Sequence, residues 1–416
     1  MSHLFFREEA CRSENSAHTL IYYIWGYAFF GSLLAAFSQR FPVFGPAVPY
    51  APYIVTISLI LFSCSFLLKR IKVFDIGFWI LYCLLFALSY VIYTQNNVIQ
   101  EEYAAESILF TYPYLFIGLN IDINAMRKSM VRISFAVILW FVFYCFIYLQ
   151  NKVGSMQDMG KREYMNYAYL VLPHILMCIW SAYKDKDIIS ILGTILGIFL
   201  LLSFGNRGSM VDIIFFVLVY VLLFIKAKHK YVIYALAIAI GGVLYYYMDV
   251  ILLFFQGLLS ELGMSTRIFD LLVDNSFLSG SSVDERDLFL SKLMTAIKEG
   301  PWFGYGFCGS WQFIGSYPHN LFFDLAITFG PVFGSMIMIC LVLLIFRAYR
   351  ATSNKDERVF LLILVTTGFV KLFISYTFLD NIETFLMIGY CLCLIRKNRS
   401  HTYQSIYERK NKKLLS

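Results

Sequence analysis

Apolar residues occur along this chain in long runs, and short clusters of charged residues separate these runs. A run of ~20 apolar residues crosses the ~30 Å hydrocarbon core of a bilayer as a helix. The pattern predicts twelve such helices, at 19–38, 49–68, 73–93, 107–121, 131–149, 164–183, 188–204, 209–225, 231–256, 319–346, 359–379 and 381–395. We therefore expect an all-α polytopic membrane protein with about 12 transmembrane helices and one large external loop.

The composition supports this class. Hydrophobic residues make up 59% of the 416 residues and charged residues only 15%, whereas soluble domains carry about 25% charged residues. A water-soluble fold could not bury so much apolar surface. These values exclude soluble enzymes and disordered chains.

The net charge of +7 is interpreted as a consequence of membrane topology and not of nucleic-acid binding. Cytoplasmic loops carry an excess of Lys and Arg, and most of the 34 basic residues fall in alternate connections if the N-terminus is cytoplasmic. The charge pattern predicts a multi-pass membrane protein with both termini cytoplasmic and no nucleic-acid partner. The first apolar run has no small-residue cleavage site after it, which predicts an uncleaved first span.

The chain divides into four segments. Residues 1–256 form a transmembrane bundle of spans 1–9, and residues 257–318 form the external loop. Residues 319–395 hold spans 10–12, and 396–416 form a basic cytoplasmic tail. Within the loop, Ser282 and Glu285 have the spacing of a capping box before an apolar stripe, and Gly300-Pro301 would end that amphipathic helix.

Arg207 is the strongest candidate for chemistry. It stands between two apolar runs, where a charge is unfavourable by ~2.5–3.5 kcal/mol at the bilayer centre. Asn206 and Gly208 flank it, and a glycine-bearing helix start with an arginine suits a phosphate oxygen. The alternative is a snorkelling arginine that ends a helix.

Four more candidates surround the large loop. His319 could accept a proton from a sugar hydroxyl, and Asn320 follows it at the start of a span. Arg286 stands at the start of the loop helix, where its charge opposes the helix dipole and suggests an anionic partner. Arg267 is the second loop arginine. The alternatives are an interfacial helix cap for His319 and neighbouring carboxylates as partners for Arg286.

Other patterns are weaker. Asp185-Lys186-Asp187 matches the DxD pattern of metal-dependent glycosyltransferases, but flanking lysines favour a solvated loop. His174 inside a span is expected to make a buried polar bond. Gly304-Tyr305-Gly306 follows no strand, so it is not a dinucleotide-binding fingerprint. No metal-ligand cluster stands out, and no metal or cofactor is expected.

The order of these motifs resembles the core shared by bacterial O-antigen ligases and Wzy-type polysaccharide polymerases. In that family an arginine precedes the proline of a Pro-x-x-Gly-x-Gly stretch by fifteen residues, which is the spacing of Arg286 and Pro301 here. The family's His-Asn pair corresponds to His319-Asn320. Its Ser-Arg-Gly corresponds to 206–208, with Asn in place of Ser. The resemblance covers about 200–335.

The resemblance implies an inverting, metal-independent GT-C type glycosyltransferase at the outer face of the bacterial cytoplasmic (inner) membrane. Its donor would be a glycan on undecaprenyl diphosphate, and its acceptor a sugar hydroxyl of another lipid-linked repeat unit. Arg207, Arg286 and His319 would be catalytic, and Arg267, Asn320, Gly208 and Asn206 would bind substrate. Membrane lipids, a flippase and a chain-length regulator are the expected partners.

Two alternatives stay open. An O-antigen ligase would use the same donor with lipid A core as acceptor. A polysaccharide transporter would also have many spans, but such folds often show internal repeats and polar sites near the bilayer midplane. No repeat is visible here.

Overall fold

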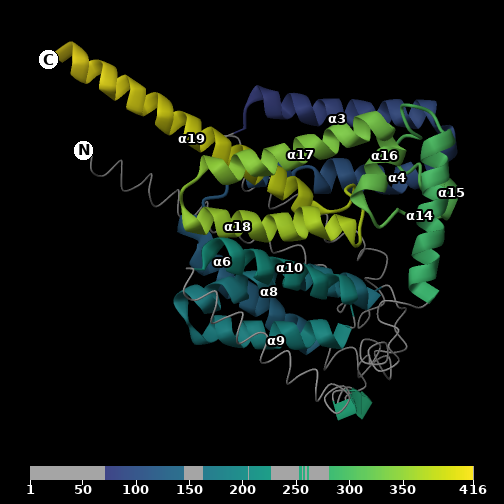
Figure 1. The fold of residues 1–416 in the computed structure, drawn as a ribbon, viewed down its shortest axis with the longest axis horizontal. Helices are drawn as coiled ribbons and strands as arrows, with labels where there is room; N and C mark the ends of the chain where they lie inside the picture. Colours follow the sequence, from purple (N-terminus) through teal and green to yellow (C-terminus); the bar gives the residue numbers. More distant parts are fainter. Residues whose placement is uncertain are drawn as a thin grey trace, which may run out of the picture. The chain divides into compact units, whose positions relative to one another are not determined.

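The computed structural model describes residues 71–144, 163–204, 206–225, 253–254, 256–257, 260–261 and 281–415. These residues form helices and connections, and none of those described forms a strand. This confirms the all-α part of the predicted fold class (Figure 1). The chain forms two compact units. The first contains residues 71–126 and 289–415, and the second contains the described residues between 127 and 288.

The first unit is built around α19, which packs against α5, α17 and α18. Its helices are α3 (Val73–Ile92), α4 (Asn97–Ala105), α5 (Tyr114–Gly118), the end of α14 (Ser281–Glu299), α15 (Trp311–Ile314), α16 (Leu321–Phe329), α17 (Pro331–Ala351), α18 (Lys355–Val365) and α19 (Ile382–Leu415). The C-terminal turns of α19 extend past α17 and α18 (Figure 1). The predicted span at 381–395 is therefore the first part of a longer helix.

The second unit is a helical bundle in which α8 packs against α9 and α10. Its elements are α6 (Ile123–Phe143, which starts in the first unit), α8 (Glu163–Asp185), α9 (Ile188–Phe204) and α10 (Arg207–Phe224). These helices follow the predicted spans at 131–149, 164–183, 188–204 and 209–225 within a few residues at most ends; α6 begins eight residues earlier. The predicted spans at 19–38 and 49–68, and almost all of 231–256, lie outside the described residues.

Two of the described helices, α3 and α17, are long and apolar enough to cross a membrane. Only 17% of the apolar window in α3 and 11% of that in α17 is buried inside the protein. Two shorter apolar helices, Ile188–Phe204 and Gly208–Phe224, belong to the second unit. The predicted number of twelve spans stays a prediction.

Three predicted spans are wrong as single straight helices. The span at 319–346 is divided into α16 and α17 at Gly330, because Pro331 starts a new helix as its first residue. The span at 107–121 is a π-helical turn, Glu106–Thr111, followed by the short α5 after Pro113. The span at 359–379 continues from α18 through a π turn, Thr366–Val370, and then leaves helical geometry after residue 373.

The loop helix is confirmed as α14, which ends at Glu299 just before Gly300-Pro301. Leu293 and Ala296 are buried from its apolar stripe and pack against Ile327 of α16. The Tyr305 hydroxyl donates a hydrogen bond to the Ala296 carbonyl oxygen at 3.2 Å. The stripe therefore packs on α16 and on the segment that follows α14.

The break at Gly330 has no room for a side chain. Gly330 has φ +80°, and a Cβ there would collide with the carbonyl oxygen of Trp302. Gly304 has φ +77°, and a Cβ there would collide with the backbone atoms of Gly330, Ile327 and Thr328. Gly330 therefore allows residues 302–304 to pack into the α16–α17 break.

We predict that Gly330→Ala strongly destabilises the first unit, because the added Cβ meets backbone atoms that cannot rotate away. Gly315→Ala is the matched control. Gly315 also has a positive φ, +63°, but a Cβ there meets nothing within 4 Å. The control should lose only the ~1–2 kcal/mol of left-handed backbone strain. Thermal unfolding in detergent would measure both, and equal losses would contradict the packing argument.

Candidate functional site

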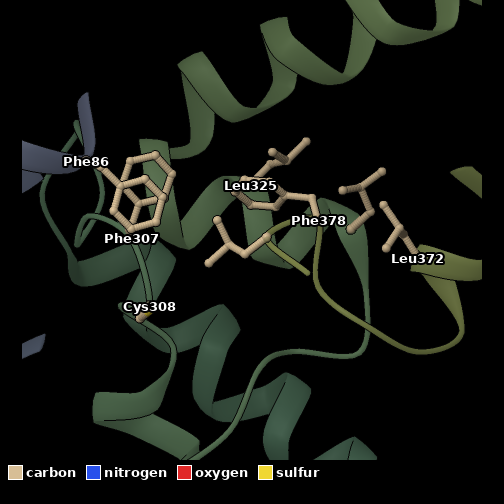
Figure 2. Close-up of a cluster of buried hydrophobic side chains, with 8 residues drawn as sticks. Phe86, Phe307, Cys308, Leu325, Leu372 and Phe378 are labelled. Carbon is tan, nitrogen blue, oxygen red and sulfur yellow. The ribbon is translucent and has the colours of Figure 1, made fainter. Parts of the chain in front are cut away.

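Residues 301–310 are held against α3 and α4 by a buried hydrogen-bond network. The Phe307 carbonyl oxygen accepts bonds from Asn96 Nδ2 at 3.1 Å and Gln100 Nε2 at 3.0 Å. The Phe307 N–H donates to Ser89 Oγ at 2.9 Å. The Phe307 ring stacks on Phe86 with ring centroids 4.0 Å apart (Figure 2). The segment after α14 is thereby fixed in one position on the helices.

The Gly-Tyr-Gly stretch joins this segment to the end of α16. The Tyr305 N–H donates to the Ile327 carbonyl oxygen at 2.7 Å, and the Gly306 N–H donates to that of Thr328 at 3.1 Å. The N–H groups of Tyr305 and Gly306 are therefore bonded within the protein, whereas a phosphate-binding glycine loop presents such groups to its ligand. In this unit the two glycines serve packing and turn geometry.

The predicted His-Asn pair begins the next helix. Asn320 is the N-cap of α16, and its side-chain oxygen accepts bonds from the N–H groups of Phe322 at 3.0 Å and Phe323 at 3.4 Å. His319 is half-buried, has φ +53°, and lies with its ring centroid 4.3 Å from that of Tyr317. The cap role therefore belongs to Asn320, and His319 precedes it in a left-handed conformation.

Three carboxylates gather in the first unit near this helix start: Glu106, Asp324 and Asp380, here called the acidic cluster. Thr377 Oγ1 donates a hydrogen bond to Asp324 Oδ2 at 2.6 Å. One carboxylate oxygen of Asp380 is inaccessible to solvent and accepts no hydrogen bond from the described residues. Leu325, next to Asp324 in the sequence, and Phe378, two residues before Asp380, belong with Leu372 to one buried apolar cluster (Figure 2). Such surroundings disfavour ionised carboxylates.

Burial is the main reason why the pKa of Asp380 is raised to about 8. The nearby charge of Glu106 raises it further, the charge of Lys371 lowers it, and that of Asp324 raises it. Burial also raises the pKa of Glu106. The pKa of Tyr103 is raised by burial, and then by the neighbouring Asp380 and Tyr317. Tyr103 therefore lies near both Asp380 of the acidic cluster and Tyr317.

A buried ion pair lies beside the acidic cluster. Lys371 Nζ is 3.4 Å from Glu383 Oε2, and their side chains are 3% and 11% exposed. The ammonium also stands 4.2 Å from the Tyr376 ring centroid. Each of the two π turns described above adjoins this region, because one begins at Glu106 and the other ends just before Lys371. π turns inside helices are frequent at functional sites.

In the second unit, Asn206 caps α10. Its side-chain oxygen accepts bonds from the N–H groups of Gly208 at 2.9 Å and Ser209 at 3.2 Å. The structure therefore uses these two N–H groups within the helix start. Asp212, one turn further along α10, is fully buried. The Arg207 backbone begins the helix, but its side chain lies outside the described residues.

The remaining candidate residues are only partly described or lie outside the described residues. The Arg286 backbone lies in the first half of α14, with its side chain outside the described residues, and Arg267 lies outside them altogether. His319 and Asn320 belong to the first unit, whereas Arg207, Asn206, Gly208 and Arg286 belong to the second.

The structure gives partners to both aspartates of the DxD pattern. Asp185 is exposed at the end of α8, and it forms a two-pronged ion pair with Arg127, which is 8% exposed. Asp187 Oδ1 accepts a bond from the Ser190 N–H at 3.0 Å and caps α9. His174 is confirmed as a buried polar bond, with Nδ1 3.3 Å from Ser134 Oγ. The described residues contain no group of three His, Cys, Asp or Glu suited to a metal ion.

Sequence reasoning missed Asp380 and the Lys371–Glu383 pair. A signal was present, because an ionisable residue inside an apolar run is expensive and is usually functional. Lys371 stands inside the predicted span at 359–379. The site around Lys371 and Asp380 was not recognised, because Glu106 and Asp324, which also belong to it, lie far from both residues in the sequence.

Comparison with known proteins adds no relative: no family model, curated protein or solved structure matches this chain.

We predict that stability falls as pH rises from about 4 to 8. In that window the Asp380 carboxyl is ionised in the unfolded chain but still protonated in the folded one, since its folded pKa is about 8. Folding therefore binds a proton, so each unit rise in pH lowers the free energy of unfolding by at most about 1.4 kcal/mol. Asp380→Asn should reduce the slope of unfolding midpoint against pH. Glu299→Gln, on an exposed position of α14, should leave it unchanged.

Proposed function

We propose that the chain is a multi-pass protein of the bacterial cytoplasmic membrane. The support is the exposed apolar surface of α3 and α17, whose described apolar windows are mostly unburied. In α3, Val73 is 87% exposed and Phe74 is 68% exposed. Contiguous apolar surface of this extent is unfavourable in water and is expected where lipid covers it. The predicted topology places both termini in the cytoplasm and the acidic cluster at the outer side.

We further propose that the protein transfers a glycan from undecaprenyl diphosphate to a sugar hydroxyl of another lipid-linked repeat unit. The observation that carries this proposal is the acidic cluster beside the α16 helix start. A carboxyl with a pKa of about 8 is close to neutrality, where a general base is most effective. Tyr103 and Tyr317, which adjoin Asp380 and His319, are rings on which a sugar can stack.

The proposed reaction is a single displacement at the anomeric carbon. The acceptor oxygen forms the new C–O bond, the bond to the diphosphate breaks, and the hydroxyl proton passes to His319 or to Asp380. The diphosphate leaves with the bonding electrons, and Arg207 and Arg286 stabilise its charge. Arg267, Asn320, Gly208 and Asn206 contribute to substrate binding. These roles for the arginines rest on the resemblance of the motifs, and the reaction requires no metal.

Two alternatives have their own support. A ligase would use the same donor and the same proton acceptor, with lipid A core as acceptor. A proton-coupled transporter is favoured by one specific observation, the buried Lys371–Glu383 pair beside carboxylates of raised pKa. Intramembrane ionisable groups that pair with one another are common in proton relays.

The deciding experiment uses the full chain in nanodiscs with undecaprenyl-diphosphate-linked repeat units, and resolves the products on a gel. Wild type should produce a regular ladder. Arg207→Ala and Arg286→Ala should each abolish it, and Arg286→Lys should restore only part, because an ammonium lacks the two-pronged contact. Product only after lipid A core is added would identify a ligase. Substrate movement without any product would identify a transporter. Full activity of both alanine variants would contradict the diphosphate role.

The roles of His319 and Asp380 are separated by the pH dependence of polymerisation. If Asp380 is the base, wild-type turnover should rise up to about pH 8, and Asp380→Asn should lower turnover at least ~100-fold and remove that rise. His319→Ala should then retain the rise with lower turnover. The opposite pattern would assign the proton to His319. In both cases EDTA should leave activity unchanged, and a strict metal requirement would contradict the mechanism.

A further inference from the structure

The first unit holds a cavity of about 390 Å³, and its lining residues do not include those of the acidic cluster. It is formed where α3 begins, where α18 begins and where α19 leaves the packed part of the unit. Its charged or polar lining residues are Lys72, Asp122, Glu357, Tyr390, Arg396 and Lys397. Leu119 and Leu394 add apolar wall. Ligand-binding cavities commonly have volumes of roughly 300–1,000 Å³, with mixed apolar and polar walls.

One side of the cavity carries an excess of positive charge. Arg396 holds Asp75 in a two-pronged ion pair, with N–O distances of 2.9 and 2.5 Å. Asp75 is only 2% exposed, so this pair neutralises a buried carboxylate. Lys72 is a second cation near Asp75, and it forms no ion pair with any described residue. Two cations therefore face one carboxylate.

The other side carries an excess of negative charge. Lys397 Nζ is 2.6 Å from Glu357 Oε1, and Glu357 is 5% exposed. Asp122 adds a second carboxylate whose charge acts on Lys397, and it is exposed. Asp122 forms no ion pair within the described part of the chain. One cation therefore faces two carboxylates, and the cavity as a whole is dipolar.

A dipolar cavity complements a ligand that carries both a negative and a positive group. A phosphate near Lys72 and an ammonium near Asp122 would balance the two leftover charges. The surroundings indicate a lipid as the source. Val73 and Phe74 directly follow Lys72 and are 87% and 68% exposed, so the positive side opens beside apolar surface suited to acyl chains. The basic clusters of the predicted topology place this end of the unit at the cytoplasmic leaflet.

We propose that this cavity binds the headgroup of a zwitterionic aminophospholipid, with the phosphate at Lys72 and the ammonium at Asp122. The site is separate from the proposed transferase residues, and it does not depend on the reaction they perform. It would anchor the start of α3 to α19 through a bound lipid.

The test is native mass spectrometry of the full chain released from nanodiscs that contain equal amounts of phosphatidylethanolamine, phosphatidylglycerol and phosphatidylcholine. Wild type should retain phosphatidylethanolamine at least fivefold more than either other lipid. Lys72→Gln should reduce this retention about tenfold. Asp122→Asn should remove the preference over phosphatidylglycerol, because the negative side is lost; the amide keeps the oxygen that accepts the Asn124 N–H.

Matched controls are Lys128→Gln and Glu102→Gln, which change exposed residues outside the cavity and should retain lipid as wild type does. Lys72 and Asp122 are exposed, so both test variants should fold, and unfolding midpoints in lipid-free detergent would verify this. Equal retention of the three lipids by wild type would overturn the proposal, as would wild-type retention by both test variants.

Thermal shifts with soluble compounds distinguish the source of the ligand. Free O-phosphoethanolamine should shift the unfolding midpoint far less than a short-chain phosphatidylethanolamine at the same concentration. An equal shift would overturn the lipid assignment in favour of a soluble zwitterion. An equal shift with inorganic phosphate would overturn the requirement for an ammonium group.

Discussion

The packing of residues 302–307 between α3 and the break at Gly330 holds the first unit together. This segment comes from the end of the long loop, yet its backbone bonds to Ser89 and Asn96 on one side and to the last turn of α16 on the other. The contact is possible only because Gly330 leaves space for the Trp302 carbonyl oxygen. Through it, the start of α16 and the Tyr317–His319 pair acquire a fixed place beside α4.

The same arrangement surrounds ionisable groups with apolar packing. Asp324 and Asp380 are close in sequence to Leu325 and Phe378 of the buried apolar cluster. Desolvation disfavours the charged form of Asp380, and repulsion from neighbouring carboxylates adds to it. A fold that only had to be stable would place apolar residues there. A carboxyl group such as Asp380 that keeps a proton near neutral pH is suited to proton transfer, which is common to the transferase and transporter alternatives.

Sequence patterns identified those features that depend on neighbouring residues. The stop of α14 at Gly300-Pro301 and the start of a helix after Asn320 follow from local backbone chemistry, and both are confirmed. The single helix predicted over 319–346 is wrong, because hydropathy does not register Gly330-Pro331 inside an apolar run. The π turns at Glu106 and Thr366 were equally invisible, since they change the hydrogen-bond pattern without changing the hydropathy. The ion pair of Asp185 was not predicted, because its partner Arg127 is 58 residues away.

The sequence by itself determined that this protein is helical and apolar, and which residues start and stop several helices, because these properties arise from composition and short-range spacing. Only the tertiary structure decided which charged groups meet. Burial in the folded unit raises the pKa of Asp380, and the charges of Glu106 and Asp324 add to the rise. Arg396 pairs with Asp75, which lies 321 residues earlier in the chain. Such pairings depend on how helices pack, and packing is set by the fit of side chains across the whole unit.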